Sequence, residues 1–187
     1  MISAIGLSLL AALAGAPETG NARAEAEASE IGASEIGAVA ARAAEAHAHL
    51  MHGDIAAYRR AIQTAPDFIL MDPFGGVPTG NPKSDADWER IGRFFRDGRD
   101  ASFRLIASYR ASDMIVLVAN EYAHVAVGSL PAQDWALRVT LVFRRDGNRW
   151  LLAHRHADPL EAGISLEEAG QITLGRRATK PVVGAGQ

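Results

Sequence analysis

The chain has 187 residues, of which 48% are hydrophobic and 22% charged, and its formal net charge is −3. This composition is typical of a globular protein, and such a small net charge gives no field that would attract nucleic acid or an anionic membrane surface. The sequence contains no cysteine, which excludes disulfides, thiolate metal sites and cysteine nucleophiles.

Residues 1–35 are predicted to be an apolar leader followed by an Ala- and Glu-rich linker. The apolar run, Met1 to Ala16, is shorter than the roughly 20 residues needed to span a bilayer. It resembles the hydrophobic region of a secretory signal peptide, although no Lys or Arg precedes it. Export to the periplasm or the medium is therefore favoured over a cytoplasmic location, with no membrane anchor in the mature form. The alternative is an uncleaved apolar tail.

Two consecutive helices are predicted next. Apolar residues recur at spacings of three and four over residues 34–52, which is typical of a helix with one buried face. Gly53 suits the left-handed position that ends a helix, and Asp54 can cap a second helix over residues 55–64. Pro66 stops this second helix. The stripe of the first helix consists of Ile36, Val39 or Ala40, Ala43, His47 and Leu50.

A short strand over residues 67–71 leads into a Gly- and Pro-rich loop over residues 72–82. Ser84 and Asp87 form a capping box for a third helix that runs to about Asp97. Four strands then follow in sequence, with a strong hairpin turn at Asp146-Gly147. Their predicted ranges are 102–110, 114–127, 135–145 and 149–158.

Helices followed by a run of neighbouring strands predict an α+β domain over residues 36–160 with an antiparallel sheet. The pattern lacks parallel crossover units and a phosphate-binding glycine motif, so a dinucleotide-binding fold is not expected. Residues 161–187 are predicted to be a tail that is largely disordered, with one short helix over residues 165–171.

The order of these elements resembles the nuclear transport factor 2-like superfamily and its SnoaL-like members. The resemblance is carried by residues 53–68 with 72–76, by 137–147, and by 150–159, which holds a Trp after the hairpin turn and a His-x-His end. These stretches are also similar to the association domain of calcium/calmodulin-dependent kinase. The resemblance implies a cone, in which helices pack on a curved antiparallel sheet and enclose a pocket. It does not imply one reaction, because this fold carries isomerases, dehydratases, hydrolases, cyclases and proteins without catalytic activity.

His154 and His156 lie two residues apart on a predicted strand, so regular alternation places both on one face together with Trp150 and Leu152. In the resembled family the closing Trp faces the pocket, which implies that both histidines do so too. There they could act as general acid or base near neutral pH. The structural alternative is that they hydrogen-bond a neighbour and orient the end of the sheet.

The hairpin register decides what faces these histidines. If the loop is Asp146-Gly147, Phe143 pairs with Trp150 and Val139 faces the histidines. If the loop has three residues, Arg138 and Thr140 join the histidines instead and form a cationic pocket for a carboxylate. The resemblance to the kinase association domain favours this second register. It would leave an apolar patch on the other face, which predicts a homodimer. That patch consists of Leu137, Val139, Leu141 and Phe143.

Further candidate residues lie on other elements. Tyr122 could donate a hydrogen bond to a developing oxyanion, Asp72 could be a carboxylate base or could cap the turn at Pro73, and Trp88 is a candidate ligand contact. His47, His49 and His52 are interpreted as a solvated helix end. No metal motif with diagnostic spacing is present in the sequence, so neither a metal nor a cofactor is expected.

Three functions fit this sequence. The first is a SnoaL-like enzyme with cofactor-free acid–base chemistry of the isomerase, cyclase or dehydratase type, in which His154 or His156 is the base and Tyr122 or Arg138 polarises the substrate. The second is a non-catalytic module that holds a small carboxylate in the same pocket. The third is an exported accessory protein that acts through oligomer contacts.

Overall fold

The computed structural model describes residues 18–173. The predicted leader and the end of the predicted tail lie outside this range. The elements in chain order are α1 (Glu18–Met51), α2 (Ile55–Ala61), β1 (Thr64–Met71), α3 (Asp85–Phe94), β2 (Phe95–Arg110), β3 (Met114–Val127), β4 (Gln133–Asp146), β5 (Arg149–Pro159) and α4 (Leu166–Thr173).

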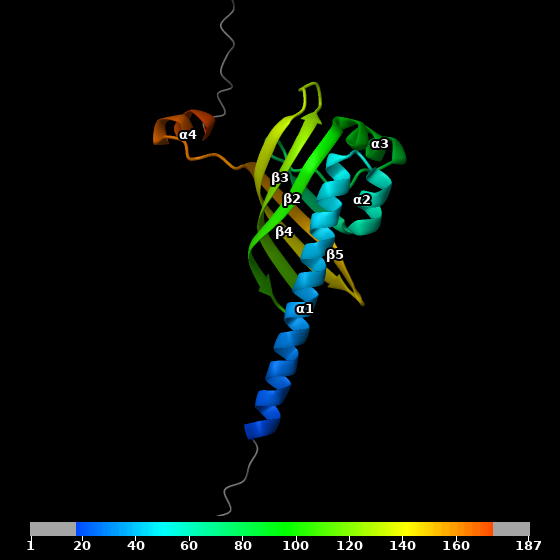
Figure 1. Ribbon diagram of the computed structural model, residues 1–187, viewed down its shortest axis with the longest axis vertical. Coiled ribbons are helices and arrows are strands. Elements are labelled where there is room, and N and C mark those ends of the chain that lie inside the picture. The colour runs from blue at the N-terminus through cyan, green and yellow to red at the C-terminus, as the bar shows by residue number, and fades with distance from the viewer. Residues whose placement is uncertain (1–17, 174–187) are drawn as a thin grey trace, which may run out of the picture.

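The strands form one curved sheet in the order β1-β5-β4-β3-β2. Helix α1 lies across one face of this sheet. Helices α2 and α3 lie beside the C-terminal end of α1 (Figure 1). The predicted α+β cone is confirmed. The sheet is mixed, however, because β1 pairs with β5 in parallel while the other neighbours are antiparallel.

Helix α1 is much longer than predicted. It begins at Glu18, so the described part of the stretch predicted to be a linker is helical. The many Ala and Glu residues there have high helix propensity, which compensates for Gly32 and Gly37 within the helix. The first part of α1 projects beyond the sheet (Figure 1), and this explains why it has no apolar stripe to be recognised in the sequence.

Strand β2 begins at Phe95, directly after α3, whereas the sequence predicts a helix to Asp97 and a strand only from residue 102. Asp97 and Asp100 have left-handed backbone angles, with φ of 57° and 56°. The pairing of β2 with β3 shifts register at the same places. These β-bulges interrupt the alternation that would have revealed the strand in the sequence.

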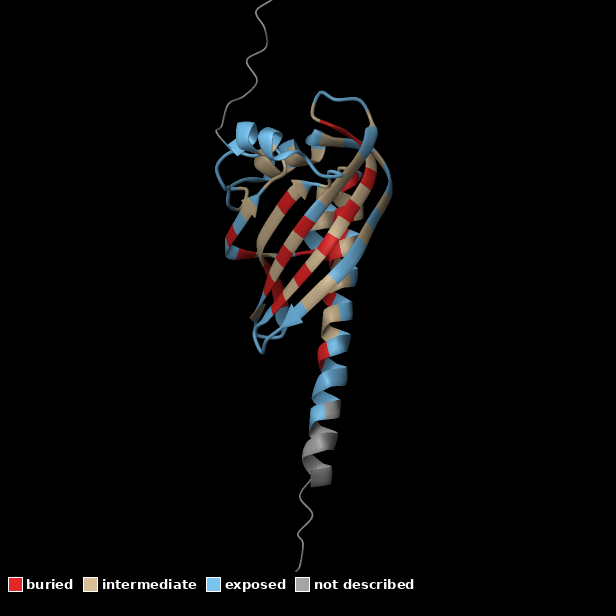
Figure 2. Ribbon diagram, turned by 90° about the vertical axis from the view of Figure 1, so that its left-hand side faces the viewer, coloured by how far each residue is buried: buried red, intermediate tan, exposed pale blue. Residues whose placement is uncertain are grey.

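The core lies between α1 and the inner face of the sheet, which is the face turned toward the helices. From Ile115 to Val125 the side chains of β3 alternate between buried and partly exposed, so buried bands cross the sheet (Figure 2). This alternation places Asn120, Tyr122 and His124 on one face and Glu121 with Ala123 on the other. The largest fully buried side chains are Phe143, Ile115, Leu117, Leu152, Val39 and Val125.

The hairpin between β4 and β5 adopts neither of the predicted registers. Asp146 pairs with Arg149 across a two-residue loop, so Arg145 is opposite Trp150. Further along, Phe143 pairs with Leu152 but Val142 pairs with His154, which leaves Ala153 as one extra residue in β5. This β-bulge reverses the faces of all the residues that follow it.

Glycine allows a close approach of backbones where the end of α1 meets β2. A Cβ atom added to Gly98 would lie 2.2 Å from the carbonyl oxygen of Met51, which belongs to the backbone and cannot swing away. The same test at Gly37, within α1, finds no atom within 4 Å.

We therefore predict opposite effects for two Gly→Ala substitutions. Gly98→Ala should lower the free energy of unfolding by ~1–3 kcal/mol because of overpacking. Gly37→Ala should raise it by ~0.5–1 kcal/mol, since alanine loses less backbone entropy in a helix. Urea unfolding followed by circular dichroism measures both values. Equal effects of the two substitutions would contradict the close approach at Gly98.

A charged cluster attaches α1 to the sheet at the C-terminal ends of β2 and β4. Glu35 on α1 accepts hydrogen bonds from Arg110 of β2 and Arg145 of β4, each with an N–O distance of 2.6 Å. The Arg145 guanidinium lies 4.3 Å from the centre of the Trp150 ring. Arg145, and after it Arg110, hold the pKa of the Glu35 carboxyl below its ordinary value.

This cluster should make stability depend on acid pH. A lowered folded-state pKa means that Glu35 stabilises the protein above its unfolded pKa of about 4.3 and that this contribution is lost as the pH falls through the folded value. The difference in unfolding free energy between the wild type and Glu35→Gln should therefore shrink between neutral pH and pH values below 4.3. Glu30→Gln, an exposed control on the same helix, should show no such narrowing in urea titrations. If the difference in unfolding free energy between the wild type and Glu35→Gln does not change with pH, Glu35 does not form this charged cluster in solution.

Candidate functional site

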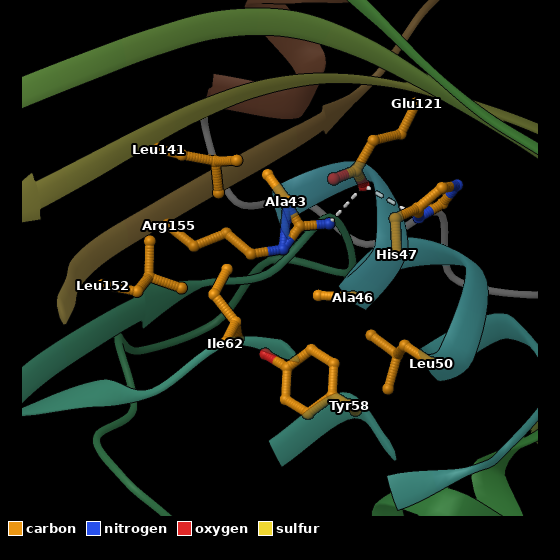
Figure 3. A pocket seen from close by; sticks show the side chains of 10 residues that line it. All are labelled: Ala43, Ala46, His47, Leu50, Tyr58, Ile62, Glu121, Leu141, Leu152 and Arg155. Atoms are coloured by element: carbon orange, nitrogen blue, oxygen red, sulfur yellow. Dashed lines mark hydrogen bonds and ion pairs between the residues drawn. The ribbon is translucent and has the colours of Figure 1, made fainter. Parts of the chain in front are cut away.

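Polar side chains from four elements converge inside the cone, between α1, α2 and the inner face of the sheet. His47 comes from α1 and Tyr58 from α2. Glu121 comes from the middle of β3, and Arg155 from β5, just after the bulge. Figure 3 shows these four side chains surrounded by aliphatic ones. All four line one small cavity.

Glu121 is the centre of this group. Its Oε2 atom accepts a hydrogen bond from Nη2 of Arg155 at 2.7 Å and lies 3.5 Å from Nδ1 of His47. The other ring nitrogen of His47, Nε2, is 3.0 Å from the backbone carbonyl oxygen of Tyr122. Since a carbonyl oxygen only accepts, Nε2 carries a proton, and the contact with Glu121 becomes an ion pair when Nδ1 is protonated as well.

These charges are removed from water. The side chains of Glu121 and His47 are each 5% exposed, and that of Arg155 is 15% exposed. Removing a carboxylate from water costs several kcal/mol unless an opposite charge and hydrogen bonds compensate. Arg155 provides both, so Glu121 and Arg155 depend on each other.

One nitrogen of Arg155 is left over. Its Nη1 atom is buried and has no hydrogen-bond partner among residues 18–173. A guanidinium has five N–H donors and does not lose its charge, so each buried donor without an acceptor costs free energy. The described residues supply no acceptor for this donor.

The cavity beside this group has a volume of about 20 Å³, which is room for about one water molecule. The Tyr58 hydroxyl turns into it, on the side of Ile62 and Arg155 (Figure 3). Burial raises the pKa of this hydroxyl above its ordinary value, with Arg155 opposing the rise and Glu121 adding to it. Tyr58 is therefore a protonated donor. The lining consists of Ala43, Ala46, His47, Leu50, Tyr58, Ile62, Glu121, Leu141, Leu152 and Arg155.

Trp88, predicted to contact a ligand, lies behind Tyr58 rather than on the cavity wall. The two ring centres are 6.1 Å apart, and the guanidinium of Arg59 lies 5.1 Å from the Trp88 ring. Trp88 on α3 thus supports the tyrosine that reaches the cavity from α2.

His154 and His156 lie on the outer face of the sheet, so the prediction that they share the face of Trp150 and Leu152 is wrong. The bulge at Ala153 turns both histidines outward and turns Arg155 inward. Nδ1 of His154 donates to the carbonyl oxygen of Ile69 at 2.9 Å. Nε2 of His156 is 3.5 Å from Asp158.

The remaining predicted residues also lie outside the cavity. Thr140 is opposite His156, and Arg138 is opposite Asp158, with 3.8 Å between their charged atoms, all on the outer face. The Tyr122 hydroxyl, on the same face, accepts a hydrogen bond from Asn120. The structure thus brings Thr140 and the histidines together, as the second register predicts, but on the opposite side of the sheet from the pocket.

Asp72 directly follows β1, and its side chain accepts a hydrogen bond from the backbone N–H of Phe74 at 2.9 Å. This contact caps the turn at Pro73, which is the structural alternative considered for Asp72.

Three of the cavity residues carried a signal in the sequence. Glu121 is the one charged position in the alternating run Ile115, Leu117, Ala119, Glu121, Ala123 and Val125, and a carboxylate on a buried face requires a partner. His47 lies on the apolar stripe of the first helix and is buried, so its interpretation as part of a solvated helix end is wrong. Tyr58 shares the apolar face of the second helix.

Within residues 18–173, no group of three or more His, Cys, Asp or Glu side chains is arranged to hold a metal ion. No helix in this part of the chain is both long enough and apolar enough to cross a membrane.

Solved structures of nuclear transport factor 2-like proteins share this fold. A superfamily member from Salmonella enterica aligns with a TM-score of 0.56 and 12% identity over 72% of this chain and 97% of its own. A candidate dehydratase from Streptomyces avermitilis aligns with a TM-score of 0.52 and 17% identity, covering 69% and 98%. A candidate calcium/calmodulin-dependent protein kinase type II association domain from Thiobacillus denitrificans gives 0.51 and 18%, covering 65% and 94%. At these identities the likeness concerns the fold alone.

The comparison with functionally curated proteins finds no significant match. The sequence profile of the SnoaL-like domain, in contrast, matches residues 39–159, which is more than half of the chain. That range begins within α1 and ends with β5, so it contains every residue of the polar cavity. With the cone-shaped α+β fold and this match together, the chain belongs to the SnoaL-like domain family.

Proposed function

We propose that the protein binds a small molecule through a carboxylate group in the cone, at the free side of Arg155. The observation that carries this proposal is the buried Nη1 atom of Arg155, which has no partner in the described chain. Arg155 lines the same cavity as Tyr58. Guanidinium and phenol donors are the groups that carboxylate oxygens bind in proteins.

The chemistry available in the cavity is acid–base chemistry without a cofactor. Glu121 and His47 are the groups that can take up or release a proton beside a bound molecule, and Tyr58 can donate a hydrogen bond to a developing negative charge. Reactions of the isomerase, cyclase or dehydratase type need no more than this. In this proposal Glu121, rather than His154 or His156, is the base.

The described cavity is too small for a molecule of several heavy atoms, so binding requires an opening. Leu50, Tyr58 and Ile62 are part of its wall. Helix α2, which carries Tyr58, has only seven residues and is joined to α1 by residues 52–54. We propose that α2 moves away from the sheet when a ligand enters.

A non-catalytic function is the second candidate. One carboxylate, that of Glu121, joins α1 through His47 and β5 through Arg155. The same contacts could serve only to lock the helix onto the sheet, with a water molecule on Arg155. This reading predicts a large effect of the ion pair on stability and no ligand.

The contribution of the Glu121–Arg155 ion pair to the free energy of unfolding can be measured. Arg155→Met should lower the free energy of unfolding by ~3–5 kcal/mol, because it leaves Glu121 buried without a partner. The double variant Glu121→Gln/Arg155→Met should recover most of this loss, since it removes both charges. Arg144→Met is the control, because Arg144 pairs with Asp67 on the exposed side of the sheet and should have a much smaller effect in urea titrations. If Arg155→Met is no worse than Arg144→Met, the pair is not buried in solution.

The ligand proposal is tested by titrating the protein with propionate, benzoate and succinate and following backbone amide shifts by NMR. Millimolar binding should shift amides around residues 47, 58, 121 and 155. Tyr58→Phe should weaken binding up to about tenfold, because it removes one hydrogen bond. The double variant Glu121→Gln/Arg155→Met should abolish binding, whereas Arg138→Met on the outer face should not change it.

Three results would overturn the ligand proposal: no shift with any of these carboxylates, unchanged binding in the double variant, or loss of binding only in Arg138→Met. If no carboxylate shifts any amide and Arg155→Met is strongly destabilising, the results support the non-catalytic function.

A further inference from the structure

The apolar side of β4 faces the interior of the cone. Val139, Leu141 and Phe143 are buried, so the exposed apolar patch predicted from the sequence for a homodimer contact does not form. Trp135 belongs to this same side, because it is opposite the buried residue Ala123 of β3. An aromatic side chain with a polar N–H group is therefore placed on the inner face, near the start of β4.

This N–H group is a second buried donor without an acceptor. The Nε1 atom of Trp135 is buried and, like Nη1 of Arg155, has no hydrogen-bond partner among the residues that the structure describes. An indole N–H can only donate, and leaving such a donor buried and unpaired costs free energy. Glu121, which binds Arg155, is two residues from Ala123 on the same face of β3. The two donors therefore belong to neighbouring positions of one surface.

One apolar side chain contacts the surroundings of both donors. Leu50 of α1 lines the same cavity as Arg155, and Figure 3 shows it on the opposite side of that cavity from Leu152. Leu50 also packs against the same apolar cluster as Trp135. A ligand that displaces this one leucine therefore extends from the cavity toward Trp135.

Aromatic rings separate Trp135 from solvent. The ring of Phe74, in the loop between β1 and α3, contacts the Trp135 ring edge to face, with centres 6.2 Å apart. Phe74 also contacts the ring of Phe94, at 5.8 Å, and is itself 56% exposed. A hydrogen bond made by the indole N–H behind these rings lies in surroundings of low polarity, where it is stronger than in water.

We propose that Trp135 is a second anchor for the ligand of the carboxylate site, and that this ligand is a carboxylic acid whose ring carries another oxygen acceptor. The carboxylate binds Arg155, the ring takes the place of Leu50, and the second oxygen accepts the N–H of Trp135. Residues two apart on a strand are separated by about 7 Å and both anchoring side chains are long, so the two oxygens lie roughly 7–10 Å apart. A keto, ether or hydroxyl oxygen meets this requirement.

The second anchor gives a selectivity that the carboxylate site alone does not have. An acid without the second oxygen leaves the Trp135 N–H unpaired in the complex, and sites with a buried unpaired donor discriminate against such ligands. This inference rests on the proposed carboxylate site, because the ligand must first be held at Arg155. It adds a preference between two carboxylic acids of the same shape, which can be absent even where the carboxylate site is real.

Probes of matched shape measure this preference. The para-acetyl derivatives of benzoate and of phenylacetate carry a ketone oxygen at two distances from the carboxylate, and the para-isopropyl derivatives have a methyl group in its place. For at least one of the two lengths, the acetyl probe should bind about 3- to 10-fold more tightly than its isopropyl partner, because only the ketone accepts a hydrogen bond. Isothermal titration of the full chain gives the four dissociation constants.

Variants assign the preference to one side chain. Trp135→Phe keeps an aromatic ring but has no N–H, so the acetyl and isopropyl probes should bind equally, while the affinity for benzoate should stay within about twofold of the wild type. Trp150→Phe is the matched control, since Trp150 lies beside Arg145 on another part of the sheet, and it should keep the preference. Circular dichroism melting checks that both variants are folded.

The wild type gives a direct readout that does not depend on any variant being stable. The chain has three tryptophans, so proton–nitrogen correlation spectra show three indole N–H signals, and the one missing in Trp135→Phe belongs to Trp135. The preferred acetyl probe should shift this signal downfield, the isopropyl probe should shift it less, and the signal of Trp150 should stay in place.

The failures of the two proposals are distinguishable. If benzoate binds but neither acetyl probe binds more tightly than its isopropyl partner, the second anchor is wrong and the carboxylate site stands. An unchanged Trp135 indole signal with the acetyl probe bound, or a preference that persists in Trp135→Phe, also overturns the second anchor. If neither benzoate nor any of the four probes binds, both proposals are overturned together.

Discussion

The ion pair between Glu121 and Arg155 is the interaction on which the interior of this protein depends. Both charges are held away from water, and neither could stay there alone. The pair therefore fixes where β3 and β5 lie relative to each other across β4, and through His47 it fixes where α1 crosses the sheet. The aliphatic side chains around it make the cone, but the pair decides which polar groups the cone contains.

Arg155 reaches this position through a single extra residue. Without the bulge at Ala153, regular alternation after Leu152 would turn His154 and His156 inward and Arg155 outward. Glu121 would then be buried beside two imidazoles instead of a permanent cation. The parallel pairing of β1 supports the arrangement that forms, because the carbonyl oxygen of Ile69 accepts a hydrogen bond from the outward-facing His154.

The cavity and the two ends of the domain contain different groups of side chains. The middle of the cone holds a small polar group in which Nη1 of Arg155 has no partner among the described residues, and this is the basis of the proposed carboxylate site. Glu35 with its two arginines fastens α1 at one end of the sheet. The other end presents the exposed aromatic side chains of Phe74 and Phe94. Membership of the SnoaL-like family gives the fold common to these features and leaves the chemistry to the particular side chains.

The sequence by itself determined the α+β class, the order of the elements and the family, because these follow from hydrophobic periodicity, capping residues and turn residues that act locally. It also contained Glu121 and His47 as polar residues on apolar faces. That pattern identifies a polar cluster only once the buried partners of these residues are known. Only the tertiary structure decided the hairpin register, the bulge at Ala153 and the choice of Arg155 over His154 and His156. The physical reason is that a strand's side chains alternate with a period of two, so one unpaired residue reverses every face after it. The free energy that selects this arrangement comes from pairing charges that lie 34 residues apart in the chain.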